Sequence, residues 1–274
     1  MPSVLMAFVC PADQIACMSP RHAAVLAVGF VSLISCLRAQ AQNAPDGQWH
    51  YLVQPYIMFP NMKGETGVRE LPLISVDESP SDIFENLQMG AMFYAEAQND
   101  RWTFSTDTLY MNLGSDVSRN EPGLIEEVNV DVSQIGWELA AMRRLTPQYE
   151  LGLGLTYNQV DVDVRIAVGL PGPPSEISGG LEEDWIDPTI VMRGTWPIND
   201  KWFVQARGNI GGFGVGSDLM WQLMADVGYQ PSEKWFLTFG YRVIDIDYEH
   251  GSGADRFVYD MQTFGPVAKV GFRF

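Results

Sequence analysis

From Trp49 onward, apolar and polar residues alternate with a period of two along most of the chain. The last segment shows the pattern best: Phe264, Phe272 and Phe274 share one face, and Lys269 and Arg273 lie on the other. A period of two is typical of a β-strand whose two faces meet different surroundings. The apolar face then packs either on the core of a soluble sandwich or on membrane lipid.

Ten segments carry this alternation, and each is predicted to form one strand. They are Trp49–Phe59, Leu87–Gln98, Trp102–Leu113, Val128–Leu145, Tyr149–Ile166, Ile186–Trp196, Trp202–Ile210, Leu219–Tyr229, Trp235–Ile244 and Thr263–Phe274. An even number of antiparallel strands leaves both ends of a barrel on the same side of the membrane. Counts of eight or twelve stay open, because Val68–Val76 also alternates in part and would extend an outer hairpin or add a strand pair.

Two local departures from simple alternation are expected. Several strands change phase midway, near Ser133, Asn158 and Ile244, which predicts β-bulges at these positions. A short helix is predicted near residues 80–87, because Ser79 or Ser81 can act as its N-cap.

Aromatic residues and turn lengths favour a membrane barrel over a sandwich. Tryptophan and tyrosine gather at or near the strand ends, as in an interfacial girdle: Trp49, Trp102, Tyr149, Trp196, Trp202, Tyr229 and Trp235. Tight turns such as Asn99-Asp100 alternate with longer links such as Gly169–Asp184. The mean hydropathy is −0.04, and after the first forty residues no apolar run approaches the ~20 residues of a spanning helix. The predicted fold class is therefore all-β, an antiparallel up-and-down transmembrane β-barrel.

The first 41 residues are interpreted as a signal peptide. Met18 is the expected true start, Ala23–Leu37 is the apolar stretch, and Ala39 and Ala41 are the small residues before the cleavage site. The barrel domain then covers residues 42–274. Two alternatives are an uncleaved anchor and lipoprotein processing at Cys36.

Charge and cysteine content narrow the chemistry. The formal net charge is −17, and residues 42–274 alone carry 15 basic and 33 acidic residues, a net charge of −18. Such a chain repels phosphate backbones, so nucleic-acid binding is rejected. All three cysteines lie in the leader, which removes disulfides and metal–thiolate sites from the barrel.

The chain end resembles the C-terminal signal of bacterial outer-membrane barrels, with Val270, Phe272 and Phe274 in alternation. The block from Trp49 to Leu113 looks like the opening of small uncharacterised outer-membrane barrels, whose architecture resembles the outer-membrane protein A and W types. The resemblance implies location in the outer membrane of a Gram-negative bacterium, contact with its lipids and lipopolysaccharide, and recognition of the last strand by the barrel assembly machinery. It brings no catalytic residues.

Alternation directs a set of charged side chains into the lumen. They are Glu96, Asp107, Asp131, Glu138, Arg144, Arg193, Arg207, Asp218, Asp226, Arg242, Lys269 and Arg273. Charges in a narrow interior have to be paired or hydrated. The preferred interpretation is a salt-bridged filling, since lumens of roughly eight strands are just filled by side chains. The alternative is a narrow porin-like channel whose selectivity these residues set.

Catalytic, cofactor and metal sites are not predicted. Only His50 and His250 could act as histidine bases in the barrel, and His250 with Ser252 and Asp255 lies on a glycine-rich loop that is poorly suited to hold a catalytic set. Acidic residues at Glu182–Asp184 and Asp245–Glu249 could gather divalent cations in outer loops, but their spacing matches no EF-hand. A structural or interaction barrel is therefore the first hypothesis, a narrow channel the second and a lipid-modifying barrel enzyme the third.

Overall fold

The computed structural model describes residues 47–68, 72–118, 125–168 and 175–274. The chain divides into the units Met1–Pro45 and Asp46–Phe274, and only the second is described. The predicted signal peptide, residues 1–41, lies outside the described residues. None of the helices in the described part is long and apolar enough to cross a membrane.

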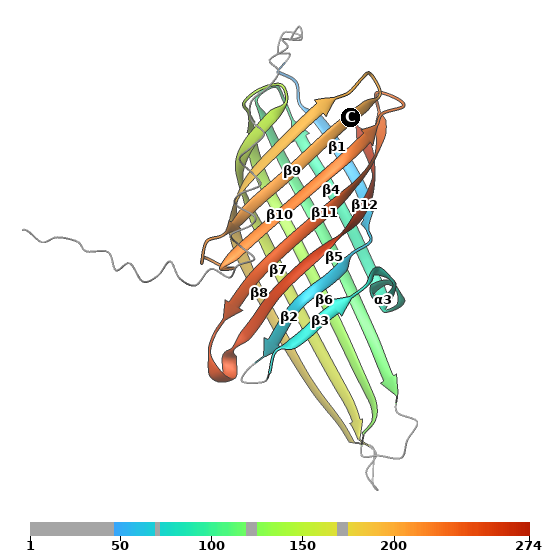
Figure 1. Ribbon diagram of the computed structural model, residues 1–274, viewed down its shortest axis with the longest axis vertical. Coiled ribbons are helices and arrows are strands. Elements are labelled where there is room, and N and C mark those ends of the chain that lie inside the picture. Colours follow the sequence, from blue (N-terminus) through green and yellow to red (C-terminus); the bar gives the residue numbers. More distant parts are fainter. Residues whose placement is uncertain (1–46, 69–71, 119–124, 169–174) are drawn as a thin grey trace, which may run out of the picture. The chain divides into compact units, whose positions relative to one another are not determined.

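Within the described residues, ten antiparallel strands close into a barrel, as predicted (Figure 1). They are β1 (His50–Met58), β4 (Leu87–Gln98), β5 (Trp102–Ser118), β6 (Ile125–Arg144), β7 (Tyr149–Val168), β8 (Ser175–Pro197), β9 (Trp202–Gly212), β10 (Leu219–Tyr229), β11 (Trp235–His250) and β12 (Phe257–Arg273). Each strand pairs with the next in this order, and β12 pairs with β1 to close the wall.

Two further strands form a hairpin outside the ring, β2 (Asn61–Val68) and β3 (Ile74–Glu78). The part of β12 from Phe257 to Phe264 pairs with β2, whereas its last part pairs with β1. The described parts of the segment Val68–Val76 therefore contribute to an outer hairpin, through Val68 of β2 and the start of β3, and this hairpin adds no strand to the barrel. It leaves β3 at the edge of the sheet.

The predicted short helix is α3 (Pro80–Glu85), and Ser79 is its N-cap. The Ser79 hydroxyl accepts from the Asp82 amide, and the Asp82 carboxylate accepts from the Ser79 amide at 3.0 Å. This reciprocal capping box satisfies two backbone donors at the start of the helix. Ile83 is buried and anchors the helix against the barrel interior.

The strands β5 to β8 are longer than predicted. The segments expected to be outer links, Gly114–Leu124 and Gly169–Asp184, are largely strand where they are described. At the opposite end of the barrel the turns are short, and in outer-membrane barrels short turns face the periplasm. That end is therefore the periplasmic end, and the long strands extend toward the outside.

The outer surface of β7 changes character along its length. Leu153 and Leu155 face outward near the periplasmic end and are more than half exposed. Farther along the same face stand Asp161 and Asp163, while Val160 is buried on the inner face. The periplasmic part of β7 thus carries apolar residues on its outer face and polar residues on its inner face. The part of β7 nearer the outside of the cell has the reverse arrangement.

The same exchange occurs in β6 and β11 without any change of register. Pairing is continuous past Ser133, Asn158 and Ile244, so the β-bulges predicted there are wrong. The register instead shifts at Leu87/Met89 and at Ile125/Glu127. The exchange marks the level where the outer surface leaves lipid and enters water, because a protein in water carries polar residues outside.

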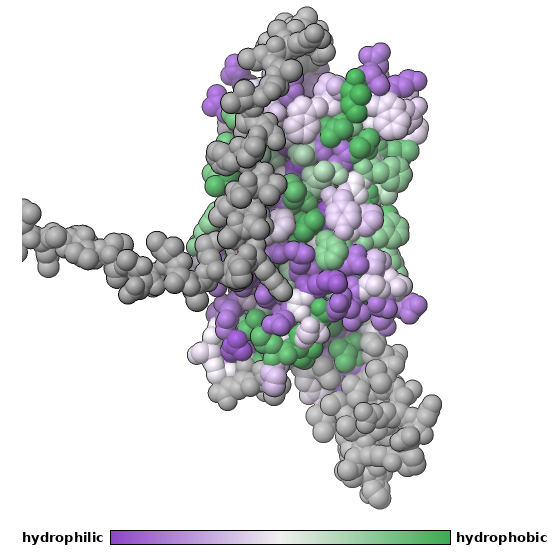
Figure 2. All heavy atoms as spheres, in the orientation of Figure 1, coloured by the Kyte–Doolittle hydropathy of each residue, from purple (hydrophilic) through white to green (hydrophobic). Residues whose placement is uncertain are grey.

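An apolar belt surrounds the periplasmic half of the barrel, which is the upper part of the molecule in Figures 1 and 2. Large hydrophobic side chains are exposed there on most strands, among them Ile57, Phe104, Leu139, Leu151, Leu153, Ile190, Met192, Leu223, Phe239 and Phe272. On the face seen in Figure 2, hydrophobic residues gather over the upper part of the picture and a band of hydrophilic residues follows below them. A belt of this kind is the lipid-facing surface of a transmembrane barrel.

Aromatic rings mark the periplasmic edge of this belt. Trp202 and Tyr229 have ring centroids 4.8 Å apart, and Tyr149 and Trp196 are 5.7 Å apart. These residues belong to the girdle that the sequence predicted at the strand ends. Their amphipathic rings suit the level of the lipid headgroups.

Candidate functional site

A layer of paired charges crosses the lumen in the periplasmic half of the barrel. Its members are Glu96, Asp107, Glu138, Arg144, Glu150, Arg193, Arg207, Asp226, Arg242 and Lys269, which we call the ion-pair layer. Except for Arg144, the side chains of the layer are at most 7% exposed. Strand alternation brings them there, because each lies on the inward face of its strand. The five cations and five carboxylates balance, as a buried set requires.

Arg193 on β8 holds two carboxylates from different strands. Its guanidinium contacts Glu96 of β4, and its Nη2 lies 2.5 Å from Glu150 Oε2 of β7. The Tyr94 hydroxyl donates to Glu96 at 2.6 Å and accepts from Arg193 at 3.2 Å. Arg144 extends the set toward the periplasm with a contact of 3.3 Å to Glu150.

Arg207 on β9 carries the layer across the middle of the lumen. It pairs with Glu138 of β6, which also accepts from the Asn209 amide. Its other N–H groups donate to the Tyr94 hydroxyl at 3.1 Å and to Ser105 at 3.2 Å. Arg207 therefore ties β9 to strands on the opposite wall, and the two arginines share one tyrosine hydroxyl.

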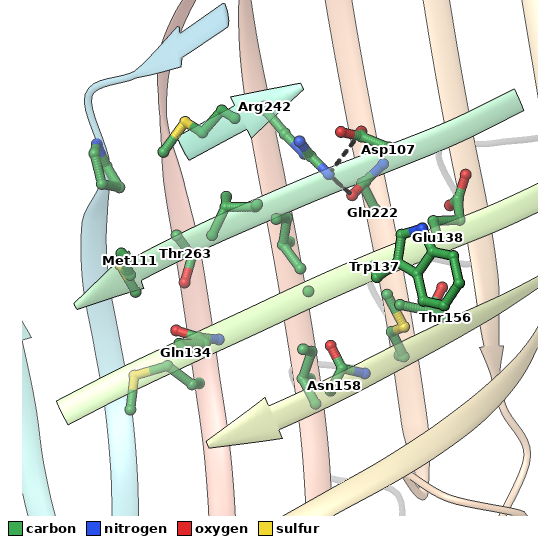
Figure 3. Close-up of a pocket in the computed structure, with 18 of the residues that line it drawn as sticks. Asp107, Met111, Gln134, Trp137, Glu138, Thr156, Asn158, Gln222, Arg242 and Thr263 are labelled. Carbon is green, nitrogen blue, oxygen red and sulfur yellow. Dashed lines mark hydrogen bonds and ion pairs between the residues drawn. The ribbon is translucent and has the colours of Figure 1, made fainter. Parts of the chain in front are cut away.

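Arg242 and Lys269 complete the layer on the other side. Arg242 Nη2 lies 3.1 Å from Asp107 Oδ2, and its Nη1 donates to the Tyr56 hydroxyl at 2.7 Å. Gln222 Oε1 accepts from the same guanidinium at 2.7 Å (Figure 3). Lys269 Nζ lies 3.2 Å from Asp226 Oδ2. The guanidinium of Arg242 is thus matched by hydrogen bonds as well as by opposite charge.

Nine of the twelve predicted lumen residues lie in this layer, and three lie apart. Arg273 is at the periplasmic mouth, where it donates to Gln230 at 2.7 Å and lies 4.5 Å over the Phe236 ring. Asp131 lies on the outer face of β6, 3.9 Å from Arg165, because the phase change at Ser133 is not a bulge.

Asp218 stands exposed just before β10, where its amide donates to the Asp247 carbonyl at 2.8 Å. Because β10 begins one residue later, at Leu219, strand alternation does not bury this side chain with the ion-pair layer.

Sequence reasoning missed Glu150, Tyr56 and Tyr94. Glu150 shares the inward face of β7 with Thr156, so alternation carried the signal, but its place beside the turn at Tyr149 hid it. The tyrosines were hidden by their type, since aromatic residues on such strands usually face lipid or the interface.

The remaining candidates are dispersed. His250 is exposed at the end of β11, and its Nδ1 lies 3.6 Å from Glu183 Oε2. Glu182 and Asp184, expected in a loop, belong to β8 and face away from Glu183, because successive side chains of a strand point to opposite faces. In the described ranges no three His, Cys, Asp or Glu residues lie close enough to hold a metal ion.

Spaces of different character lie on the two sides of the layer. A polar mouth of about 420 Å³ opens at the periplasmic end, bordered by Gln98, Arg144 and Arg273. On the side of the layer that faces the outside of the cell is a void of about 50 Å³ (Figure 3), which has room for only a few water molecules.

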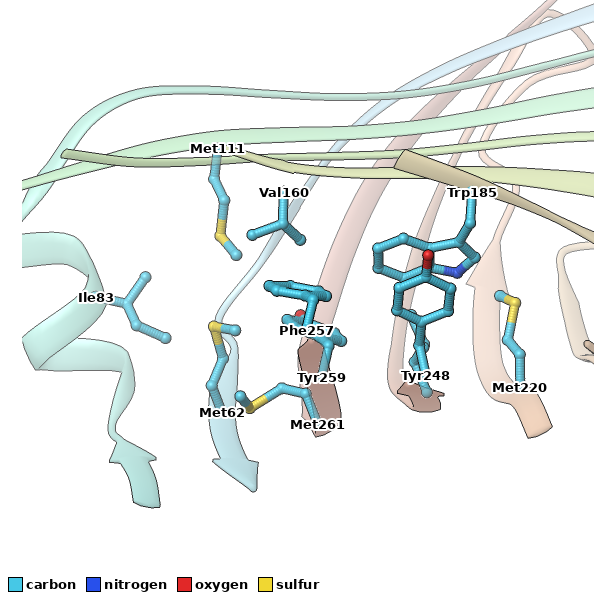
Figure 4. Packing of buried hydrophobic residues seen from close by; sticks show 11 residues of the cluster. Met62, Ile83, Met111, Val160, Trp185, Met220, Tyr248, Phe257, Tyr259 and Met261 are labelled. Carbon is cyan, nitrogen blue, oxygen red and sulfur yellow. The ribbon is translucent and has the colours of Figure 1, made fainter. Parts of the chain in front are cut away.

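Farther toward the outside of the cell, a cluster of buried apolar side chains forms a second barrier, which we call the outer apolar cluster (Figure 4). Its members are Met62, Ile83, Met111, Val160, Trp185, Met220, Ile246, Tyr248, Phe257, Tyr259 and Met261. Trp185 of β8 stacks on Tyr248 of β11 with centroids 4.0 Å apart, beyond the outer ends of the shorter strands β9 and β10. Burial near Glu183 raises the pKa of Tyr248 to about 12, so its hydroxyl stays protonated.

The fold is similar to those of solved outer-membrane barrels. Outer membrane protease OmpT from Escherichia coli matches with a TM-score of 0.52 and 10% identity, over 85% of this chain and 99% of that one. Ail, the attachment invasion locus protein of Yersinia pestis, matches with a TM-score of 0.37 and 9% identity, over 82% and 98%. Neisserial surface protein A matches with a TM-score of 0.30 and 12% identity, over 85% and 100%. No protein-family model and no curated protein matches the chain.

A closed antiparallel barrel with an apolar outer belt, an aromatic girdle and a polar lumen defines the class of the protein. It is an integral β-barrel of the bacterial outer membrane. The similarity to the protease concerns the fold, because 10% identity carries no information about the reaction.

Proposed function

We propose that the protein is a non-conducting barrel that serves as a structural and interaction module of the outer membrane, without catalysis of its own. The observation that carries the proposal is the ion-pair layer. A permeating ion would have to separate Arg207 from Glu138 and Arg242 from Asp107, and leave buried charges unpaired. Breaking such pairs is costly in a low-dielectric interior. The outer apolar cluster adds a second, dehydrating barrier on the same path.

Planar-bilayer recording tests this proposal. Residues 42–274, folded in detergent and inserted into a bilayer at high salt, are expected to give no conductance steps. The double variant Arg207→Ala with Glu138→Ala removes a matched pair without leaving a lone charge. Its conductance shows whether opening the ion-pair layer at this pair is enough to let ions pass. Steady ohmic steps from the unchanged protein, with a selectivity altered by Arg242→Ala, would instead favour the narrow channel.

The last strand supports a second element of the proposal, delivery by the barrel assembly machinery. Val270 and Phe272 face outward in β12, and Phe274, which directly follows the strand, is 75% exposed. Phe274→Ala is expected to reduce the amount of assembled barrel in cells severalfold, while refolding of the purified chain in detergent stays unchanged. Phe239→Ala, on the lipid-facing surface of β11, is the control. Equal losses for both variants would show that the effect is one of general lipid contact.

A further inference from the structure

A large apolar cavity lies above the ion-pair layer, between two walls of the outer part of the barrel. Its volume is about 710 Å³, within the range of roughly 300–1,000 Å³ that is usual for small-molecule sites. One wall is formed by β2, β3, α3 and the outer part of β12, and the other by the inward faces of β5 to β8. Apolar side chains dominate both walls, with Val76 and Ile83 facing Val132, Val162 and Leu181.

The barrel wall is interrupted beside this cavity. The last pair between β4 and β5 joins Leu87 to Leu113, and beyond it β5 pairs with β6 alone. On the other side, β3 is the edge of its sheet, and among the described strands none lies between β3 and the outer part of β5 (Figure 1). The Asn86 carbonyl, at the end of α3, accepts from the Gly114 amide at 2.9 Å, so α3 borders the interruption on its periplasmic side.

The surface below the interruption is apolar and continues the lipid-facing belt. Phe93 and Met89 are exposed on β4, and the rings of Phe59 and Phe84 lie 5.5 Å apart beside α3. Ile74, which lines the cavity, is 64% exposed at the edge. These exposed apolar residues lead from the lipid-facing belt to the interruption, where Glu78 and Asp82 stand at the entrance of the cavity.

Charge in the lining discriminates between lipid headgroups. The charged residues among the described lining are Glu78 and Asp82, and both are acidic. Hydrogen bonds from the Ser79 hydroxyl and amide lower the pKa of Asp82, which keeps this carboxylate ionised. An anionic headgroup is repelled there. Deeper inside, Gln134 donates to the Tyr259 hydroxyl at 2.9 Å, which leaves that hydroxyl free to donate to a neutral oxygen.

We propose that this cavity binds a neutral, long-chain aliphatic molecule, an alcohol or an ester, which enters from the outer leaflet between β3 and β5. The proposal rests on the proposed function in one respect, since the closed layer below makes the cavity a binding site and not part of a path across the membrane. The occupant is held by burial of its chain. Its neutral oxygen faces Tyr259, and the carboxylates at the entrance exclude fatty acids.

Photo-crosslinking tests the proposal directly. The folded chain 42–274 in phosphatidylcholine nanodiscs is incubated with a diazirine-bearing hexadecanol or the matching hexadecanoic acid, irradiated and mapped by mass spectrometry. The alcohol is expected to label peptides that line the cavity about tenfold more than the acid, from the repulsion between like charges at short range. Glu78→Lys is expected to reduce this preference. Equal labelling by both probes, or labelling confined to the lipid-facing belt, would overturn the proposal.

Matched variants separate binding from folding. Val162→Trp fills the cavity and is expected to abolish the labelling, whereas Asp163→Trp, next to it on the outer face of β7, leaves it unchanged. Ile74→Glu changes an exposed side chain at the entrance and is also expected to reduce the labelling, and the gel mobility of the unboiled variant reports whether the barrel is folded. Undiminished labelling in both Val162→Trp and Ile74→Glu would contradict the site. Conductance of the same samples is independent of this outcome, so a labelled barrel that conducts refutes the closed lumen alone.

Discussion

Replacing Arg207 with methionine is expected to lower the free energy of unfolding by about 3–5 kcal/mol, because the change leaves a buried carboxylate without its cation. The Arg207 side chain is 2% exposed, and of its partners among the described residues Glu138 would keep only the Asn209 amide. The measurement is urea unfolding of the barrel in lipid vesicles, followed by tryptophan fluorescence and by gel mobility with and without boiling.

Two controls show whether the loss arises from an unpaired charge. In the double variant Arg207→Met with Glu138→Gln, the Gln carbonyl can still accept from Asn209, so most of the lost stability should return. Lys63→Met breaks the exposed pair with Asp77 and is expected to cost less than about 1 kcal/mol. If the double variant is as unstable as the single one, lost packing and not charge is the cause.

Leu153→Arg is expected to destabilise the barrel in lipid by about 2–4 kcal/mol, the cost of a cation near the middle of a bilayer. Leu153 is 69% exposed on the outer face of β7, between the girdle residue Tyr149 and the level of Asn158. The same unfolding assay measures the effect.

Asp161→Arg is the matched control, on the same face of the same strand. Asp161 lies above the level at which the outer surface becomes polar, and its neighbour across the strand pair is Glu182. An arginine there meets water and an acidic neighbour, so a change within about 0.5 kcal/mol is expected. A large loss at both positions would place the lipid boundary higher than the polarity of the surface indicates.

Alternation predicted the ten barrel strands and left open whether Val68–Val76 extends an outer hairpin or adds a strand pair, and the short helix was predicted from its possible N-caps, Ser79 and Ser81. The prediction of β-bulges at Ser133 and Asn158 was wrong, because at these positions the residues on one face of the strand change from apolar to polar without a change of register. A register slip and a change of surroundings produce the same pattern in the sequence, because both invert which face is apolar. The misplacement of Asp131 in the lumen follows from this ambiguity alone.

Strand alternation predicted which charged residues of the ion-pair layer face the lumen, but it could not predict which of them pair with each other. The contact of Arg193 with both Glu96 and Glu150 depends on barrel diameter and strand tilt, which join residues 97 and 43 positions apart. Tyr56 and Tyr94 were missed for a different reason, since an aromatic type favours lipid contact in this class and only their hydroxyl partners place them inside.

The apolar cavity had no signature in the sequence. Its valines, such as Val132 and Val162, fit equally well on a lipid-facing surface, and only the outer position of these strands turns them inward. The interruption between β3 and β5 likewise depends on β12 exchanging its partner from β1 to β2, a long-range choice that local pattern does not encode.

A cysteine scan along the outer face of β7 tests the passage from lipid to water most directly. The cysteines of the chain all lie within its first 36 residues, so each variant of residues 42–274 carries a single thiol. In nanodiscs, a membrane-impermeant maleimide is predicted to react slowly at Leu151→Cys, Leu153→Cys and Leu155→Cys, and rapidly at Gln159→Cys, Asp161→Cys and Asp163→Cys. Rapid reaction at the three leucine positions, or protection that continues past Asn158, would contradict the assignment of the periplasmic half to lipid and the half nearer the outside of the cell to water.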